Sequence, residues 1–207
     1  MQPQLFETLD TRLTAIRARA MVTRSRNHVR RAKSEAVLAE VLPEMIEDGC
    51  SYHVISHGDV DALSFLTHLV KSSPFDYVMV STWCMAMPDV DQLLTWLASG
   101  RIGELDFILG EIFPTQYPDE TDKLYRLQAN GEPVHVRIAR NHAKIILACN
   151  EDESSYYTLE SSANVNTNPR IEQSCLTRNQ DLFEFYRDFY AGIKSVCKNP
   201  YAPRQPN

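Results

Sequence analysis

The sequence has 207 residues, of which 43% are hydrophobic, so it can bury one sizeable core and is too short for two ordinary domains with a linker. No stretch approaches the roughly 18 uninterrupted apolar residues of a membrane span, and the N-terminal segment lacks the apolar centre of a secretory signal. We therefore expect a cytoplasmic protein without stable membrane insertion. The five cysteines form no CxxC pair, which argues against a disulfide framework and against a cysteine zinc site.

The charge is distributed unevenly along the chain. The formal net charge is -6, yet residues 1–34 hold eight bases and two acids (+6), which leaves 13 bases and 25 acids (-12) for the remainder. Arg-rich segments make salt-dependent contacts with nucleic-acid phosphates, although a solvated helix face or a mobile arm is the plainer interpretation. The candidate nucleic-acid contacts in this segment are Arg24, Arg26, Arg30 and Arg31.

The N-terminal segment is also helical in character. Residues 5–47 lack Gly, contain a single Pro and place apolar residues at spacings typical of amphipathic helices, so we predict one or two helices there. The predicted organisation is a helical, basic N-terminal extension over residues 1–48, a main domain over residues 49–198 and a tail over residues 199–207.

Beyond this extension, short β-rich runs alternate with helical segments. The predicted strands span residues 52–56, 77–83, 105–113, 134–139, 144–149 and 156–161. Helical segments at 61–72 and 89–99 separate the first three strands, which predicts crossover connections and a largely parallel or mixed sheet with helices on both faces. The last strands leave no room for a helix, so we expect antiparallel pairing between residues 134 and 161.

A closing helix begins near Asp181. Its sequence places Leu182, Phe185, Phe189 and Ile193 on one apolar face. Together with the alternating strands and helices, this helix predicts an α/β fold.

Two ionisable residues stand at the start of the strand predicted over residues 144–149. His142 and Lys144 are two apart, so their side chains should project from the same face. After the next strand comes the polar run SSANVNTNPRIEQ, at a position where α/β sheets place ligands. Imidazole, ammonium, hydroxyl and amide groups together suit an anionic phosphoryl group, because they supply a nucleophile, a fixed positive charge and neutral donors.

These residues resemble the phospholipase D superfamily, whose signature is HxK followed at a distance by GSxN. The sequence has HAK at residues 142–144 and SSAN at residues 161–164, with Glu172 where family members often carry a downstream acid. The resemblance covers residues 52 to about 196 and includes the small single-motif members found in phage and bacterial genomes. It implies a phospholipase D-like fold, with helices on both faces of a mixed sheet, and the cytoplasm of a bacterial or phage-infected host cell.

The resemblance also implies a role for each matching residue. His142 would attack phosphorus and form a phosphohistidine, while the same residue of a second copy would protonate the leaving oxygen. Lys144 and Asn164 would hold the phosphoryl oxygens. Ser162 would add a hydrogen bond, and Glu172 would orient an imidazole. Further substrate contacts are assigned to Ser161, Asn166, Arg170 and His57. The mechanism requires no metal and no cofactor.

Two positions depart from the family pattern, and only one HxK is present. Cys149 replaces the family's Asp and Ser161 replaces the Gly of GSxN, which leaves room for a non-catalytic relative. A two-histidine mechanism needs two chains when each has one HxK. We therefore predict a homodimer in which the two His142 side chains face each other across a shared cleft.

Other polar residues have simpler explanations. His57 and Asp59 follow a predicted strand, where His57 lines the cleft or Asp59 caps the next helix. Trp83 ends another strand, where core packing is favoured over stacking on a base. Without a Cys pair or an HExxH helix, His53, His57 and His68 are not predicted to bind a metal ion.

The leading functional hypothesis is a metal-independent, dimeric phosphodiesterase that acts on DNA or RNA, with the Arg-rich segment supplying affinity for the phosphate backbone. One alternative is a phospholipid phosphodiesterase or transferase, since the same chemistry serves any phosphodiester. No lipid-binding hydrophobic loop is evident, so this alternative ranks lower. The other alternative is a non-catalytic nucleic-acid-binding protein that keeps the fold.

Overall fold

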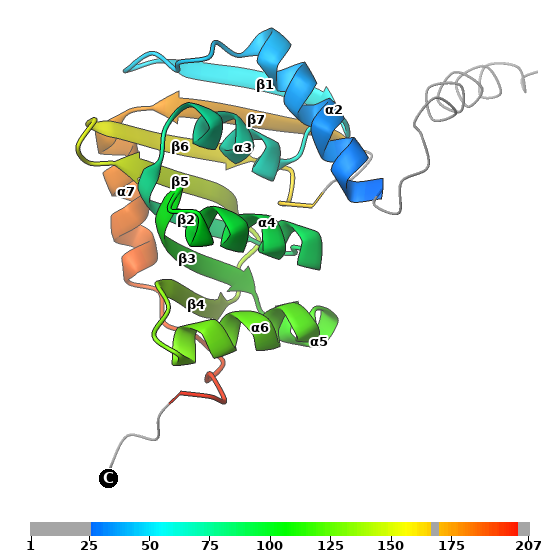
Figure 1. Cartoon of the computed structure of the whole chain (residues 1–207), viewed down its shortest axis with the longest axis vertical. Helices are drawn as coiled ribbons and strands as arrows, with labels where there is room; N and C mark the ends of the chain where they lie inside the picture. The colour runs from blue at the N-terminus through cyan, green and yellow to red at the C-terminus, as the bar shows by residue number, and fades with distance from the viewer. Residues whose placement is uncertain (1–25, 167–169, 203–207) are drawn as a thin grey trace, which may run out of the picture.

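The computed structural model of the protein describes residues 26–166 and 170–202 (Figure 1). The helices are α2 (Arg26–Val41), α3 (Ala62–Ser72), α4 (Met87–Ala98), α5 (Phe113–Gln116), α6 (Pro118–Ala129) and α7 (Gln180–Ala191). The strands are β1 (Ser51–His57), β2 (Phe75–Thr82), β3 (Ile102–Gly110), β4 (Val134–Ala139), β5 (Lys144–Asn150), β6 (Ser155–Ser161) and β7 (Ile171–Arg178). The six predicted strands are all present, with ends that differ by a few residues from those expected.

The seven strands form one sheet in the order β1-β7-β6-β5-β2-β3-β4. The neighbours β2, β3 and β4 are parallel, because α4 and the α5–α6 pair make the crossover connections between them. All other neighbouring pairs are antiparallel, so β5 and β7 run against the remaining five strands. The predicted α/β class with a mixed sheet is confirmed.

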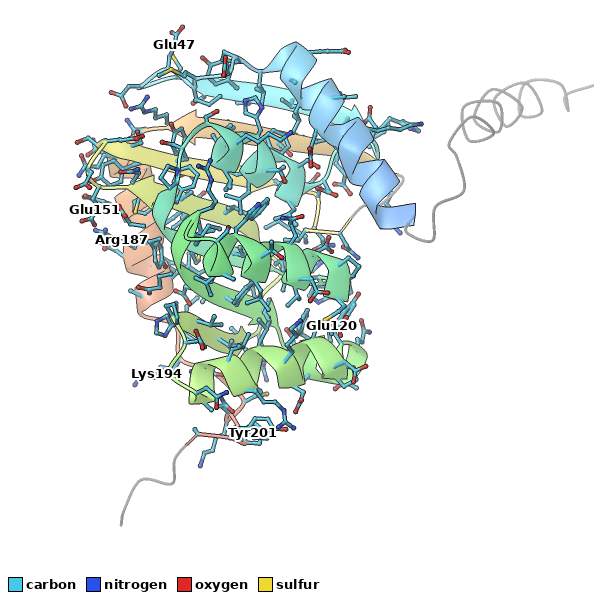
Figure 2. The ribbon with its side chains drawn as sticks, viewed as in Figure 1. Glu47, Glu120, Glu151, Arg187, Lys194 and Tyr201 are labelled. Atoms are coloured by element: carbon cyan, nitrogen blue, oxygen red, sulfur yellow. The ribbon has the colours of Figure 1, made fainter. Side chains whose placement is uncertain are left out.

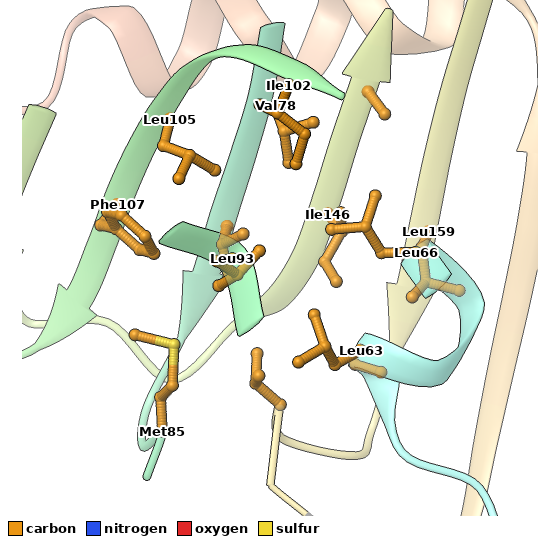
Figure 3. Packing of buried hydrophobic residues seen from close by; sticks show 14 of the residues in the cluster. Leu63, Leu66, Val78, Met85, Leu93, Ile102, Leu105, Phe107, Ile146 and Leu159 are labelled. Atoms are coloured by element: carbon orange, nitrogen blue, oxygen red, sulfur yellow. The ribbon is translucent and has the colours of Figure 1, made fainter. Parts of the chain in front are cut away.

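Helices lie on both faces of the sheet, with α3, α4 and α6 on one face and α7 on the other (Figure 1). The larger core lies between the sheet and the first set of helices. Figure 3 shows its centre, where Leu63 and Leu66 of α3 and Leu93 of α4 meet Val78, Ile146 and Leu159 of the strands. A smaller core under α7 is formed by residues that include Met79, Leu147 and Phe183. Burial of these apolar side chains is the main force holding the helices to the sheet.

The seventh strand, β7, was not predicted from the sequence. Its residues IEQSCLTR carry few large apolar side chains, and the polar run before it suggested a continuous loop. The strand forms because its backbone pairs with β6 on one side and with β1 on the other. Pairing of this kind between distant segments overrides weak local β-propensity.

The antiparallel pairing expected between residues 134 and 161 is confirmed for β5 with β6 and is wrong for β4. β4 pairs in parallel with β3 at the edge of the sheet. The reason is that α6 carries the chain back across the sheet before β4 begins. Helix α6 has the usual signs of a helix N-terminus, with Pro118 in its first turn followed by Asp119 and Glu120.

The apolar face predicted for the closing helix is wrong for Phe185 and Phe189, whereas Ile193, just beyond the end of α7, packs against the smaller core as expected. In α7 the buried side chains are Phe183 and Tyr190, whereas Phe185 and Phe189 are 66% and 65% exposed. The helix has two apolar rows at helical spacing, and periodicity alone does not choose between them. The observed row is the one that packs on the sheet, where Phe183 and Tyr190 join the smaller core with Met79 and Leu147.

Helix α2 is part of the main core. Of the four candidate nucleic-acid contacts, Arg24 lies outside the described residues, whereas Arg26, Arg30 and Arg31 belong to α2. The C-terminal half of α2 packs on α3, and Leu38 is fully buried in the larger core. The helix thus joins a basic segment to the folded body.

Two local details also differ from the sequence prediction. The sequence suggested Asp59 as the cap of α3, but the cap is Asp61, whose carboxylate accepts hydrogen bonds from the Ser64 backbone N–H (2.8 Å) and hydroxyl (2.7 Å). Asp59 instead accepts from the His57 backbone N–H (3.1 Å). The first residues of the predicted tail contact α6: Figure 2 shows Tyr201 beside this helix, where its ring lies under the Arg126 guanidinium.

Within the described residues, no helix has the length and apolar character needed to cross a bilayer.

Candidate active site

The predicted site residues gather at one edge of the sheet because β5 is antiparallel to its neighbours. The start of β5 therefore lies beside the ends of β2 and β6. Lys144 pairs directly with Ser161 of β6, and Ser161 pairs with Ser174 of β7. The HxK and SSxN segments, which are distant in sequence, thus become neighbours in space.

His142 and Lys144 are in direct contact, although only Lys144 belongs to β5 and His142 lies just before the strand on which both were predicted. The imidazole is exposed, while the Lys144 side chain is buried and only 8% of the residue is accessible. Lys144 Nζ lies 2.9 Å from His142 Nδ1 and donates to the His142 carbonyl oxygen at 2.6 Å. A buried ammonium beneath an exposed imidazole is the central feature of this edge.

Burial lowers the pKa of Lys144 below that of a solvated lysine, because removing the ammonium from water disfavours its charged form. The nearby Cys84 and Glu172 act in the opposite direction and partly restore the pKa. An incoming anion would act in the same sense as these two groups. Lys144 is therefore a cation for which the structure provides only partial compensation.

Ser162 and Glu172 form a separate pair beside this centre. The Ser162 hydroxyl donates to a carboxylate oxygen of Glu172 and accepts from the Gln173 backbone N–H at 3.0 Å. The Ser162 N–H donates to the Gln173 carbonyl oxygen at 2.9 Å, which fixes the turn after β6 against the start of β7. Among the described contacts, Glu172 bonds to Ser162 and not to the imidazole that it was expected to orient.

The loop after β6 is attached to the end of β2. The Thr82 hydroxyl lies 3.4 Å from Asn164 Oδ1, and the Cys84 thiol donates to Asn166 Oδ1 at 3.3 Å. Both amides therefore direct their oxygens toward β2, and within the described part of the chain neither Nδ2 has a hydrogen-bond partner. The two amides are available as neutral donors.

Cys84 was not predicted as part of the site, yet it connects several of its groups. Burial raises the pKa of the Cys84 thiol, while hydrogen bonds with Tyr117 and Asn166 and the charge of Lys144 oppose the rise. The thiol therefore serves as a neutral donor to Asn166. The only indication of this role in the sequence was that Cys84 stands at the end of a predicted strand.

The two positions that depart from the phospholipase D pattern are both accommodated. The Ser161 hydroxyl bonds with the Ser174 hydroxyl (2.8 Å) and accepts from the Ala163 N–H (3.0 Å), so it stabilises the start of the loop. Cys149 lies at the opposite end of β5, roughly 17 Å along the strand from Lys144. It is buried in the smaller core, and this burial raises its pKa to about 11.

One of the predicted substrate contacts, His57, lies away from the centre. His57 ends the edge strand β1, and β7 and β6 lie between it and β5, which corresponds to roughly 14 Å across three strand spacings. Arg170 is exposed immediately before β7. Within the described residues, no group of three or more His, Cys, Asp or Glu side chains is placed to hold a metal ion.

Trp83 and Asn141 complete the surroundings of His142. The Trp83 ring is half-buried and its centroid lies 5.3 Å from that of the imidazole, so Trp83 belongs to the site and not to the core, where the sequence placed it. Asn141 is buried and was not singled out from the sequence. Its side chain joins the ends of β2 and β3 to the segment that carries His142.

Comparison with known proteins defines the fold and no more. No family model matches the chain, and no curated protein matches it. The α/β architecture is similar to that of TrmBL2, whose structure is described as that of an archaeal chromatin protein with a novel mode of DNA binding. The two share 7% sequence identity with a TM-score of 0.50, over 92% of this chain and 65% of TrmBL2. This chain therefore spans less than two thirds of the length of that structure.

Proposed function

We propose that the protein is a metal-independent phosphodiesterase of the phospholipase D type, which cleaves DNA or RNA through a phosphohistidine at a site shared by two copies of the chain. The observation that carries this proposal is the exposed His142 imidazole with the buried Lys144 ammonium 2.9 Å from its Nδ1. A nucleophile and a fixed cation at this distance suit attack on a phosphodiester, where negative charge accumulates on the phosphoryl oxygens.

The contact between these two residues bears on the protonation of the imidazole. While Lys144 donates to Nδ1, the proton of a neutral imidazole is on Nε2. A phosphoryl oxygen that accepts the Lys144 hydrogen bond leaves Nδ1 free to hold the proton. The lone pair of Nε2 is then available for attack, so substrate binding itself prepares the nucleophile.

The proposed reaction has two steps. In the first, His142 Nε2 forms a bond to phosphorus, the bond to the leaving oxygen breaks, and the protonated His142 of the partner copy donates its proton to that oxygen. In the second, water forms a bond to phosphorus as the bond between phosphorus and His142 Nε2 breaks, and the proton lost by the water returns to the partner's imidazole. Lys144 and the free Nδ2 groups of Asn164 and Asn166 hold the phosphoryl oxygens in both steps.

The requirement for two copies can be tested by mixing. Each chain has one HxK, so a cleft formed by one intact chain and one His142→Ala chain lacks either the nucleophile or the acid. When an excess of the His142→Ala protein is added and the subunits have exchanged, the activity of the mixture should fall below the activity expected from the fraction of intact chains alone. A monomer by light scattering with undiminished turnover would contradict the shared site.

Nucleic acid is the substrate favoured by the charge distribution. In Figure 1 the first turn of α2, which includes Arg26, lies on the side toward which β1 and β3 point, the side of the candidate site. A basic helix at this edge would supply contacts to the phosphate backbone. The DNA binding of TrmBL2 is compatible with this proposal. Replacing Arg26, Arg30 and Arg31 by Gln should weaken binding and flatten its dependence on salt.

The decisive experiment is cleavage of DNA and RNA oligonucleotides in the presence of EDTA. The intact protein should be active, and His142→Ala should lose at least about a thousandfold of the activity, since removing a nucleophile has effects of this size or larger. The matched control is His135→Ala, which removes another exposed histidine, from β4 at the edge of the sheet. A fully active His142→Ala protein would refute the proposal.

The same preparation separates the two alternatives. Hydrolysis of a phospholipid head group, with no cleavage of oligonucleotides, would identify a lipid phosphodiesterase. Tight oligonucleotide binding without a covalent phosphoryl adduct on His142, for every substrate offered, would identify a non-catalytic binding protein.

A further inference from the structure

We infer that Trp83 is a positioning residue for His142, and that Gly110 is the residue that admits the Trp83 ring to this position. The inference rests on the proposed function, because it assigns Trp83 to the orientation of the proposed nucleophile. It concerns a side chain that no motif includes and whose position near the end of β2 suggested a core residue.

The first observation is the ring contact. The centroids of the Trp83 and His142 rings are 5.3 Å apart and the rings are inclined at 51°. Aromatic pairs at this separation attract each other, and the face of an indole also attracts a cation such as a protonated imidazole. Trp83 therefore restricts the imidazole in both of the protonation states that the two-step reaction needs.

The second observation is the space left by Gly110. A Cβ atom added to Gly110 would lie 2.6 Å from Trp83 Cδ1 and 3.2 Å from the carbonyl oxygens of Trp83 and Asn141. The first distance is shorter than any ordinary contact. Any other residue at position 110 would therefore displace the Trp83 ring or the backbone beside it. Gly110 is needed here for the close approach of the ring.

The third observation is that the backbone around His142 is already fixed. The Asn141 side chain donates to the Ile108 carbonyl oxygen (2.9 Å) and to the Ser81 hydroxyl (3.0 Å), and it accepts from the Ala143 N–H (3.0 Å). The freedom left to His142 is rotation of its exposed side chain. The Lys144 hydrogen bond restrains one ring nitrogen, and the Trp83 ring restrains the ring plane.

A spectroscopic experiment tests the contact without any assay of activity. The sequence has two tryptophans, so Trp96→Phe leaves Trp83 as the single fluorescent indole. A protonated imidazole quenches a neighbouring indole, so Trp83 emission should rise as His142 loses its proton. His142→Ala in the same background should abolish this rise, and Gly110→Ala should reduce it. An unchanged pH response in the His142→Ala protein would overturn the inference.

A kinetic experiment tests the positioning role. Gly110→Ala should lower kcat about a hundredfold with little change in KM, because a small misplacement of a reacting group has effects of this order. The matched control is Gly192→Ala, where the added Cβ would have its nearest contact at 3.6 Å and the backbone φ is -76°. Trp83→Phe should retain most of the activity and Trp83→Ala should lose it.

Loss of folding can be told apart from loss of positioning. The double variant Gly110→Ala/Trp83→Ala removes the 2.6 Å clash with the ring, so it should be more stable than Gly110→Ala alone while kcat stays low. A double variant with full activity, or a Gly110→Ala protein with unchanged kcat, would contradict the role of Trp83. If the intact protein cleaves no phosphodiester, the proposed function fails, and the fluorescence experiment still decides whether Trp83 holds the imidazole.

Discussion

Two cations of the sheet, the half-buried Arg137 and the buried Lys144, are used in opposite ways. Arg137 lies under α7, where it forms an ion pair with Asp106 and donates to the Tyr190 carbonyl oxygen. Burial, and then the neighbouring Asp106, raises the pKa of Tyr77, which donates to the same carboxylate at 3.0 Å. Lys144, at the candidate site, bonds only to His142 and has no ion-pair partner among the described residues. A cation matched by an anion of its own chain stabilises the fold, whereas one without an ion pair is left for an external anion.

The largest expected effect is on activity, from removal of Lys144. Lys144→Met should reduce phosphodiester cleavage by about 10²–10³-fold, as for other donors to a developing oxyanion. The free energy of unfolding should stay the same or increase, because the cost of burying an ammonium is removed. Oligonucleotide cleavage and urea denaturation of one preparation would measure both quantities. A Lys144→Met protein that is active, or that is unfolded, would contradict the contrast with Arg137.

The complementary variant is Arg137→Met, and its effect should be on stability. It leaves the Asp106 carboxylate buried without its cation, which should lower the free energy of unfolding by about 3 kcal/mol. Urea denaturation would measure the loss. Activity per folded molecule should be unchanged at temperatures well below the transition, and a selective loss of activity would show that the two clusters are coupled.

The two ends of β5 should also differ in their response to pH. Because the pKa of Cys149 is raised to about 11, the unfolded chain loses this proton first, and stability should fall as the pH rises from the ordinary thiol pKa of 9.0. The loss between pH 9 and 11 should be about 2 kcal/mol, and Cys149→Val should lack it. The lowered pKa of Lys144 has the opposite sign, so its contribution rises with pH. Urea denaturation of both proteins across this pH range measures the difference.

The smallest expected effect is from Ser162→Ala. The hydroxyl is exposed and its partners are the Glu172 carboxylate and the Gln173 N–H, both accessible to water. Its loss should change stability by less than about 0.5 kcal/mol, as for other surface substitutions. Activity should fall only severalfold, because Lys144 and the amides still hold the phosphoryl oxygens. A loss as large as that of Lys144→Met would assign Ser162 a more direct role.

Much of the fold could be predicted from the sequence, because six strands have β-rich runs and two crossover helices have clear periodicity. β7 could not, since its backbone is held by partners that are more than a hundred residues away on one side. The row of α7 that is buried depends on the strand side chains under it, such as Met79 and Leu147, which periodicity along one helix does not include. Long-range pairing and packing account for both errors.

The site shows the same division. That His142 and Lys144 belong together follows from the HxK spacing, whereas their contact is made by the Lys144 side chain, which reaches back from the first residue of β5 to the imidazole and carbonyl of His142. The contact between Trp83 and His142 depends on a missing side chain at Gly110, on a third strand. The role of Asn141 likewise depends on the joint position of two strand ends. Residues of a motif were predictable, whereas the residues that hold the motif in place were not.

The pairing of Lys144 with Ser161 has a consequence for finding related sequences. The two halves of the motif stand at the open end of a hairpin, and the turn over residues 151–154 closes it at the far end. Adding one residue to each strand near that turn, or changing the turn itself, leaves the register at the site intact. The number of residues between HxK and SSxN is therefore free to vary among relatives with the same chemistry. A search that fixes this number would overlook them, and one that requires a hairpin of any length between the two halves would not.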